Sequence, residues 1–348
     1  MPNHALPDQV YQLLTPQGQL VGSAPDLSDD QFLALYRWMV LSRQFSDRMI
    51  ALQRQGRTGT FAALNGQEAA AALALPLQRG DWLAGSYRDI PAYLCKGAPL
   101  LALMETYQGR VGAHYPKEAH VLPFQIILGT QMLHAVGIAM GIQYDGQAQV
   151  AVGICGDGAT SEGDFNEALN FAGVFNAPVV LVVQDNQWAI STPRARQTAA
   201  ARIAHRGVGF GVSAHLVDGN DALALYQVMS ECVARARAGD GPSLIETITY
   251  RLGAHSTADD PTKYRTTDEL SEWQARDPLV RYRRFLMDRA LLSPNDDELL
   301  HEEVDAEIQA AVEALEALAP QDPKALFDYV YAEPTRQLQE QRSALFPE

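Results

Sequence analysis

Short apolar runs alternate with longer segments of helical spacing along most of the chain. The short runs are rich in β-branched residues and predict strands at 82–86, 149–155, 178–183, 214–217 and 243–250. Between them, apolar residues recur with the period of a helix, which predicts helices over 28–55, 66–75, 99–108, 131–144, 161–175, 220–239, 278–286 and 293–318. This alternation predicts an α/β fold.

The two ends of the chain lack a sustained pattern. Residues 1–26 are polar and are interrupted by four prolines, so we expect an extended arm. Ser28 and Gln31 have the spacing of a capping box, which predicts the start of the first long helix. Residues from 320 onwards offer few core residues. We therefore predict an arm over 1–27, one main domain over 28–331 with C-terminal helices from about 278, and a tail over 332–348.

Residues 153–192 contain the most informative pattern. A buried strand, a Gly-Asp-Gly turn, a helix and a second buried strand form a βαβ unit. The turn lies at the carboxyl edge of a parallel sheet, where such folds bind ligands. A following helix directs its N-terminal N–H groups at the turn, which favours a phosphate.

The carboxylate in this turn indicates a metal ion. Asp157 would repel a phosphate unless a cation bridged the two, and oxygen ligands favour magnesium or calcium. Asn186 follows the next strand and supplies a second, neutral oxygen. We therefore predict a metal–diphosphate site. A dinucleotide-binding loop would need a third glycine near Ser161, where the sequence has none, and a plain surface turn would not need Asn186.

Two further segments offer candidate chemistry. Arg88 follows the strand at 82–86, and its paired N–H donors suit a diphosphate, although an Arg–Asp surface pair with Asp89 is the alternative. The polar connection 251–268 is long enough to indicate a functional loop, and it contains His255. The loop 109–124 contains His114 and His120, which have no third metal ligand nearby in the sequence.

Composition narrows the range of functions. The 348 residues carry a formal net charge of −15, which argues against nucleic acid as a partner. The three cysteines have neither metal-site spacing nor a disulfide pattern, so a reducing cytoplasm is expected, and Cys155 is interpreted as a buried packing residue. No apolar run is long enough to cross a membrane, and the N-terminus resembles no targeting segment. We expect a bacterial-type cytoplasmic protein.

Several motifs carry a family resemblance. Gly156-Asp157-Gly158, followed just under thirty residues later by Asp185-Asn186, resembles the thiamine diphosphate motif, with Asp185 in place of the usual first Asn. The flanking sequences TSEGDF (160–165), NFAG (170–173) and AISTP (189–193) resemble the alpha subunit of the 2-oxo acid dehydrogenase first component. The likeness extends from about residue 27 to 331. It implies the thiamine diphosphate-binding fold, a mostly parallel sheet with helices on both faces and helical extensions at both ends.

The resemblance assigns roles to individual residues. It implies that Asp157, Asn186 and the backbone carbonyl of Trp188 bind Mg²⁺. Leu128 would wedge under the thiamine, Ile126 would offer backbone hydrogen bonds to the aminopyrimidine, and His255 would contact the diphosphate and act as a catalytic proton donor. The full set of implied cofactor-binding residues is Tyr87, Arg88, Ile126, Leu128, Gly156, Asp157, Gly158, Ala159, Gln184, Asn186, Ile190 and His255.

The implied reaction is oxidative decarboxylation of a small 2-oxo acid with reductive acylation of a lipoyl group. The family takes the carboxylate that activates thiamine from a beta subunit, and this chain contains no second thiamine-type half. The resemblance therefore implies a heterotetramer of two alpha and two beta chains, working with a dihydrolipoyl acyltransferase core. Pyruvate is the favoured substrate, because Ala254 stands where branched-chain enzymes often have a second His. The alternatives are a branched-chain alpha subunit, an acetoin dehydrogenase alpha subunit and a non-catalytic paralogue.

Overall fold

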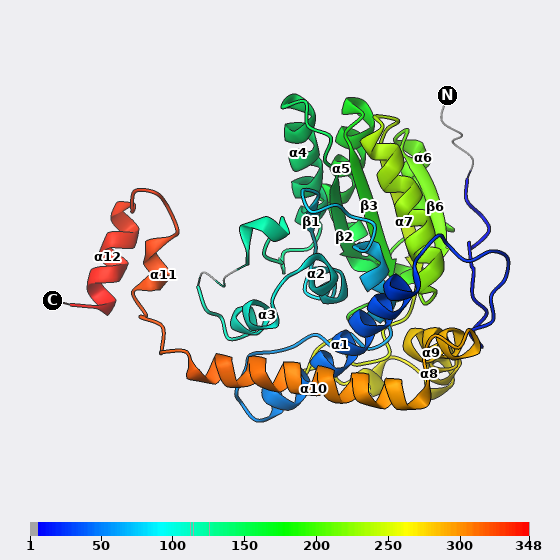
Figure 1. Cartoon of the computed structure of the whole chain (residues 1–348). Helices are drawn as coiled ribbons and strands as arrows, with labels where there is room; N and C mark the ends of the chain where they lie inside the picture. The colour runs from blue at the N-terminus through cyan, green and yellow to red at the C-terminus, as the bar shows by residue number, and fades with distance from the viewer. Residues whose placement is uncertain (1–5, 112, 114, 125, 348) are drawn as a thin grey trace.

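A parallel sheet of five strands, in the order β1-β2-β3-β7-β6, organises the chain (Figure 1). The computed structural model describes residues 6–111, 113, 115–124 and 126–347. The strands of the sheet are β1 (Trp82–Ala84), β2 (Ala151–Gly156), β3 (Val179–Asp185), β6 (Ser213–Asp218) and β7 (Ser243–Ile248). Each lies within two residues of a predicted run. A short hairpin of β4 (Trp188–Ala189) and β5 (Thr192–Pro193) follows β3.

Helices cover both faces of the sheet, as predicted. Val180 and Val182 of β3 face a core shared with α1 (Asp29–Arg54) and α7 (Ala222–Arg237). The alternate side chains of β3, from Val179 to Val183, face a second core with α4 (Thr130–Tyr144) and α5 (Gly163–Phe175). Because side chains alternate along a strand, a strand that is apolar at every position must be covered on both sides.

The remaining helices surround this layered core. They are α2 (Ile90–Lys96), α3 (Leu100–Tyr107), α6 (Ala204–Gly209), α8 (Thr267–Gln274), α9 (Pro278–Asp288), α10 (Pro294–Ala317), α11 (Ala325–Asp328) and α12 (Arg336–Leu345). Five 3₁₀ turns are described: η1 (Glu68–Leu73), η2 (Lys117–Ala119), η3 (Asp157–Ser161), η4 (Arg194–Arg196) and η5 (Pro261–Lys263). Ser28 and Ser293 both form capping boxes, so local sequence sets the starts of α1 and α10.

Several elements differ from the sequence-based expectation, and helices α2, α6, α11 and α12 were not predicted. The predicted helix over 66–75 is the short 3₁₀ turn η1, whose small side chains are all buried. The turn at Asp157 continues as η3 before α5 begins, so α5 starts two residues later than predicted. Helix α8 begins at the Thr266 cap, near the end of the predicted loop 251–268, and occupies most of the stretch before the predicted helix at 278.

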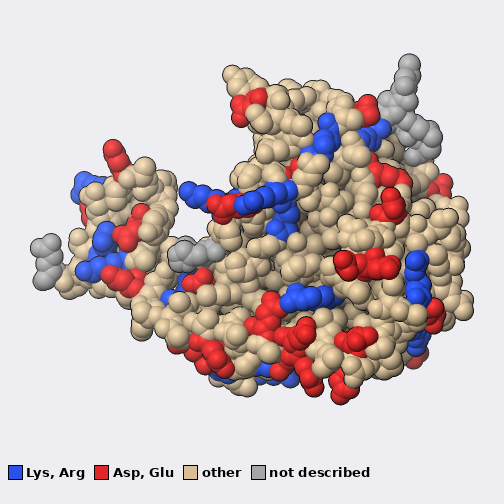
Figure 2. Space-filling model, in the orientation of Figure 1, with Lys and Arg blue, Asp and Glu red and all other residues tan. Residues whose placement is uncertain are grey.

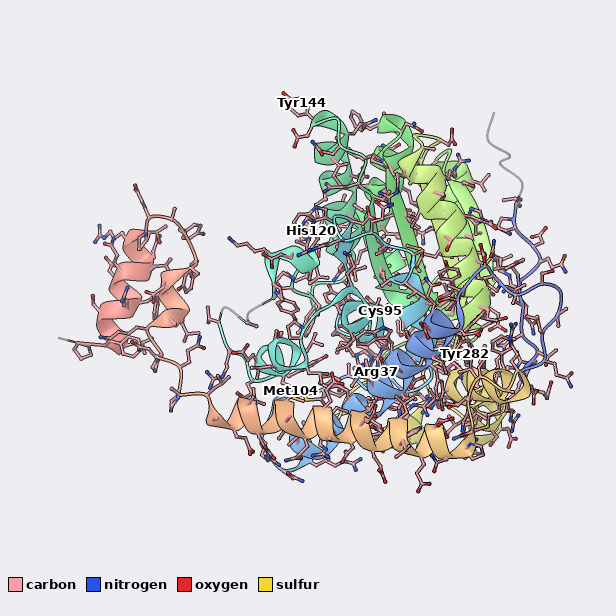
Figure 3. All side chains as sticks on the ribbon, viewed as in Figure 1. Arg37, Cys95, Met104, His120, Tyr144 and Tyr282 are labelled. Carbon is pink, nitrogen blue, oxygen red and sulfur yellow. The ribbon has the colours of Figure 1, made fainter. Side chains whose placement is uncertain are left out.

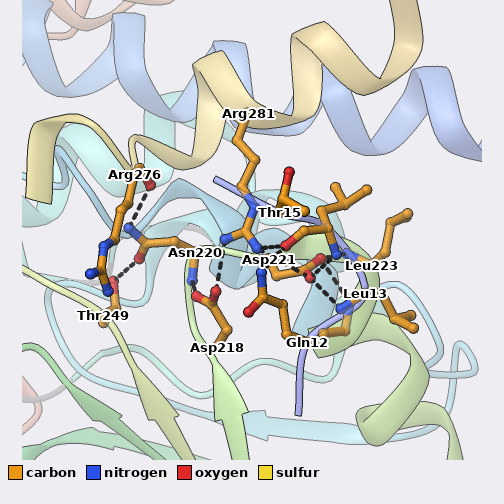
Figure 4. A network of polar contacts seen from close by, with 12 residues as sticks. Gln12, Leu13, Thr15, Asp218, Asn220, Asp221, Leu223, Thr249, Arg276 and Arg281 are labelled. Carbon is orange, nitrogen blue, oxygen red and sulfur yellow. Dashed lines mark hydrogen bonds and ion pairs between the residues drawn. The ribbon is translucent and has the colours of Figure 1, made fainter. Parts of the chain in front are cut away.

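The N-terminal arm is fixed to the domain by a buried polar network (Figure 4). Asp221 caps α7 and also accepts hydrogen bonds from the backbone N–H of Leu13, at 2.7 Å, and of Leu14. Arg281 from α9 pairs with Asp218 at 2.8 Å and with Asp221 at 3.4 Å, and it donates to the carbonyl of Leu14. Arm, sheet edge and C-terminal helices therefore meet at one buried arginine.

Arg281→Met is expected to lower the free energy of unfolding by about 3 kcal/mol, because it leaves Asp221 charged and buried without its cation. Urea denaturation followed by circular dichroism measures the change. Arg336→Met, which removes an exposed ion pair with Glu340 in α12, is the matched control and should change stability by less than about 1 kcal/mol. A similar small loss in both variants would contradict the role given to Arg281.

The C-terminal helices α11 and α12 stand away from the sheet (Figure 1). They contact each other through the rings of Phe327 and Phe346, whose centroids lie 6.3 Å apart. Several apolar side chains nearby are exposed, including Leu326 and Tyr329. The division into arm, main domain and tail stays a prediction.

Charged side chains lie in separate groups on the surface (Figure 2). On the face shown in Figure 2, acidic side chains gather along the lower edge, where α10 lies. Exposed apolar groups occur on α4 and α5: Tyr144 projects from the outer end of α4 (Figure 3), and Phe171 stacks on Phe175 at 5.6 Å. Among the described residues, no helix has the length and apolar character that crossing a membrane requires.

Candidate functional site

A pocket forms where the carboxyl ends of β1, β2, β3 and β7 meet, which is the edge predicted to bind a ligand. Twelve of the predicted residues line it: Tyr87, Arg88, Leu128, Gly156, Asp157, Gly158, Ala159, Gln184, Asn186, Trp188, Ile190 and His255. These residues come from five separate segments of the chain. The structure therefore brings together nearly the whole predicted set.

The predicted metal ligands lie on adjacent strand ends. Asp157 follows β2, and Asn186 follows β3, which is paired with β2 in register at Gly156 and Gln184. Asp157 is 2% exposed, and Gln197 donates to its carboxylate at 2.8 Å. Burial raises the pKa of Asp157 to about 6, and the negative charge of Asp185 adds to the effect.

The hairpin after β3 is shaped by unusual backbone geometry. Ile190 has a φ of 55°, a left-handed conformation that a β-branched residue rarely adopts. Its carbonyl accepts a hydrogen bond from Arg251 at 2.8 Å, and the carbonyl of Trp188 accepts one from the same guanidinium at 3.3 Å. A Cβ on Gly158 would lie 2.8 Å from the Cβ of Ala189, so this glycine allows the turn and the hairpin to pack together.

Positive charge is concentrated on the other side of the pocket. Arg88 is 5% exposed; it donates to the carbonyl of Ala63 and to the carbonyl of His255 at 2.9 Å. Arg251 lies beside His255, with a nitrogen 3.3 Å from Nδ1, and its Nε is buried without a partner among the described residues. Burial lowers the pKa of both arginines. Burial, then Arg88 and Arg251, also lowers the pKa of His255 to about 4, so this imidazole is neutral at pH 7.

The two sides of the pocket fit a metal-bound diphosphate. Burial raises the pKa of Asp157 and lowers the pKa of Arg88 and of Arg251, because it disfavours the charged form of each side chain. A divalent cation beside the carboxylate and a diphosphate beside the arginines would favour those charged forms. Among the described residues, no cluster of three histidines, cysteines or acidic residues could hold a metal alone. This agrees with a site in which phosphate and backbone oxygens complete the shell.

Comparison with known proteins decides the family. The model of the dehydrogenase E1 component family matches residues 36–324. The chain belongs to the dehydrogenase E1 component family. This family match confirms the resemblance inferred from the Gly-Asp-Gly motif and its flanking sequences.

Curated relatives carry two kinds of name. The E1 chain is 46% identical to the 3-methyl-2-oxobutanoate dehydrogenase subunit alpha of Mycobacterium tuberculosis, over 92% of this chain and 88% of that protein. It is 40% identical to the pyruvate dehydrogenase E1 component subunit alpha of Staphylococcus aureus, over 96% of this chain and 91% of that protein. Both names fit the predicted activity and its branched-chain alternative.

Some predicted residues lie outside the pocket of the E1 chain. Ile126 is 72% exposed and does not line it, so its contact with the cofactor stays a prediction. The His120 ring packs at a tilt against Trp82, with ring centroids 4.7 Å apart, and its Nδ1 lies 3.0 Å from the carbonyl oxygen of Gly80, which makes it a packing residue. His114 is outside the described residues.

Other residues of the pocket were missed from the sequence. Gln67, Ser86, Asp89 and Ala189 line it, and Arg251 lies behind it. Gln67 lies in a segment for which the sequence predicted only a helix, yet it accepts a hydrogen bond from Asn186 at 3.0 Å. The Gly66-Gln67 sequence was a signal: Gly66 has a φ of 98° and packs against the carbonyl of Tyr250, which places Gln67 at the pocket.

Proposed function

We propose that this chain is the alpha half of a thiamine diphosphate-dependent 2-oxo acid dehydrogenase. Such an enzyme decarboxylates a 2-oxo acid and transfers the acyl group to the lipoyl group of a dihydrolipoyl acyltransferase. The observation that carries the proposal is the pocket itself, which Asp157, Asn186 and Arg88 line, with Arg251 behind it beside His255. The family membership supports the same activity.

The residues present suggest how the cofactor is held. Asp157, the side-chain oxygen of Asn186 and the carbonyl of Trp188 would bind Mg²⁺. Arg88 would pair with the diphosphate, since a guanidinium binds phosphate oxygens through paired N–H donors. Gly158 leaves space at the turn, and Leu128 would support the thiamine rings from the pocket wall. When bound, thiamine diphosphate supplies the carbanion and the electron sink for decarboxylation.

His255 is proposed as the proton donor of acyl transfer. It lies beside two arginines, and burial together with their charges lowers its pKa to about 4, so at pH 7 the chain alone holds the neutral imidazole and not the more acidic imidazolium. A diphosphate beside it would offset the charges of Arg88 and Arg251, which raises the pKa of the imidazole. The same anion that the arginines bind would therefore prepare His255 for its role.

A beta subunit is required to complete the site. Asp89 and Asp157 are the carboxylates among the described pocket residues, and both are already engaged. The carboxylate that activates thiamine must then come from another chain. Exposed apolar side chains support cover by a partner: Leu128, at 38%, lines the pocket, and the adjacent Ile127 is 67% exposed. We propose a heterotetramer of two alpha and two beta chains bound to an acyltransferase core in the cytoplasm.

The substrate is proposed to be a small 2-oxo acid, with pyruvate favoured by Ala254 and a branched-chain acid as the alternative. The 46% identity to a 3-methyl-2-oxobutanoate enzyme supports that alternative. Acetoin and a non-catalytic paralogue are the remaining candidates. None of these candidates changes the residues of the cofactor site.

We expect the alpha–beta complex to reduce an artificial electron acceptor with a 2-oxo acid, in the presence of thiamine diphosphate and Mg²⁺. The assay compares kcat/KM for pyruvate, 3-methyl-2-oxobutanoate and acetoin, and the preferred substrate should lead by at least about tenfold, since a pocket discriminates by 1–3 kcal/mol per methylene. Omission of the cofactor is the control. Failure of the complex to bind thiamine diphosphate would indicate the non-catalytic paralogue.

A further inference from the structure

A line of buried side-chain hydrogen bonds leads from Asp89 to Asn186. Gln184 donates through Nε2 to Oδ1 of Asp89, and its Oε1 accepts from Nε2 of Gln67 at 3.0 Å. Oε1 of Gln67 in turn accepts from Nδ2 of Asn186 at 3.0 Å. The four side chains are between 1% and 6% exposed. They connect the segment after β1 with η1 and with the end of β3.

The direction of these hydrogen bonds is fixed at one end. An ionised carboxylate only accepts, whereas an amide has one accepting and one donating end. The pKa of Asp89 is raised by burial to about 6, so Asp89 is ionised at pH 7. Its Oδ2 accepts from the N–H of Ser86 at 2.7 Å and from the hydroxyl at 3.0 Å, which leaves Oδ1 for Gln184. Each amide must then present its nitrogen toward Asp89 and its oxygen away from it.

This order determines which atom of Asn186 is free for a ligand. Nδ2 of Asn186 is held by Gln67, so Oδ1 is the end that remains for a cation. The backbone N–H of Trp188 also donates to Oδ1, at 3.2 Å, which fixes the same orientation from the other side. A reversed amide would direct N–H groups at the metal site, and these repel a cation.

We propose that Asp89, Gln184 and Gln67 form an orienting relay that presents the side-chain oxygen of Asn186 to the divalent cation. The inference deepens the proposed function and rests on the metal site that it assigns to Asp157 and Asn186. The three relay residues are positioning residues, since they act through Asn186. Groups that orient metal ligands typically alter metal affinity by 10–100-fold.

Asp89→Asn is the direct test. An Asn at this position keeps its oxygen on the two donors of Ser86, which turns its NH₂ toward the nitrogen of Gln184. Along the line of hydrogen bonds from position 89 to the backbone N–H of Trp188, at least one contact must then place two donors or two acceptors against each other. Because an unmet buried polar group is costly, the affinity for Mg²⁺ should fall roughly tenfold.

A second substitution should repair the defect. In the Asp89→Asn, Gln67→Glu double variant, the new carboxylate accepts from Asn186 and from Gln184, and Gln184 turns its oxygen toward the new Asn. Every hydrogen bond in the line is again satisfied, and the total charge equals that of the original chain. Mg²⁺ affinity should therefore return to within about twofold of the original value. Gln67→Glu alone places two carboxylates beside the one amide of Gln184, so this variant should bind Mg²⁺ more weakly than the double variant does.

The measurement is a Mg²⁺ titration of the alpha–beta complex with thiamine diphosphate present, followed by calorimetry. Asp145→Asn, on the exposed end of α4, is the matched control and should leave the affinity unchanged. Asn186→Ala serves as the reference for the metal site. If Asn186→Ala leaves Mg²⁺ affinity unchanged, the metal assignment fails and the relay with it.

Two other results would overturn the relay while leaving the metal site intact. One is a full loss of Mg²⁺ affinity in Asn186→Ala with no loss of affinity in Asp89→Asn. The other is a loss in Asp89→Asn that the added Gln67→Glu does not recover, because ordinary packing damage cannot be repaired by a second charge change. Recovery in the double variant supports the relay alone, since no general effect on folding predicts it.

Discussion

Asp157→Ala is expected to abolish Mg²⁺-dependent binding of thiamine diphosphate by the alpha–beta complex. Asp157 is the proposed acidic ligand of the metal, and the phosphate oxygens cannot approach this turn unless a cation is held there. Substitution of residues that only orient a metal ligand typically lowers metal affinity by about 10–100-fold. Loss of the carboxylate ligand itself should therefore lower the Mg²⁺ affinity by more than roughly 100-fold. Isothermal calorimetry with and without Mg²⁺ measures the effect, and unchanged affinity would refute the metal assignment.

The same variant separates function from folding. Burial raises the pKa of Asp157 to about 6 from 3.8, so its ionised form is disfavoured by the fold. The ionised carboxylate therefore lowers the stability of the folded chain, and this loss is absent at low pH and develops as the pH rises from 3.8 to about 6. At pH 7, Asp157→Ala should therefore leave the metal-free chain at least as stable as before, as judged by Tm. Asp145→Ala, at the exposed C-terminal end of α4, is the control, and its affinity for the cofactor should be unchanged.

The chain purified alone is expected to show no decarboxylation of any 2-oxo acid. Its pocket offers Asp89 and Asp157 as carboxylates, and neither is available to activate the thiamine. Part of the pocket wall is also open, since Ile127 and Leu128 are exposed and water can enter. The artificial-acceptor assay measures turnover, and addition of the separately purified beta subunit should restore it. Turnover by the lone chain at the rate of the complex would contradict a half-site.

The sequence predicted the sheet and most long helices correctly because their signals are local. Strand β3 is apolar at nearly every position, and Ser28 and Ser293 show the caps of α1 and α10 directly. The 3₁₀ turn η1 could not be foreseen in this way. Its alanines suit a helix, but Gly66 and the packing against Tyr250 shorten the segment. Helix α8 was missed because its residues are mostly polar and none is buried.

The site was predictable only in part from residue types. The spacing of Asp157 and Asn186 identified the metal ligands proposed here, and the family resemblance added Arg88, His255 and Leu128. Gln67 and Asp89 were missed because their role depends on the residues that they contact in the fold. Those residues, Asn186 and Gln184, are more than ninety positions away in the sequence. A neutral amide indicates function only through its context, such as the spacing of Asn186 from Asp157, because the same residue type also occurs on any surface.

Both edges of the sheet are occupied by short pieces of the same chain. Tyr11 of the arm bridges to Val217 at the β6 edge, and Val121 bridges to Leu83 at the β1 edge. A bare edge strand is a template for pairing with another molecule, which leads to aggregation. Here each edge has a backbone neighbour at one point, since Tyr11 hydrogen-bonds to Leu216 and Asp218, and Leu83 to His120 and Leu122. We therefore expect other subunits to join through helices and loops, and we expect deletion of the arm to uncover part of the β6 edge.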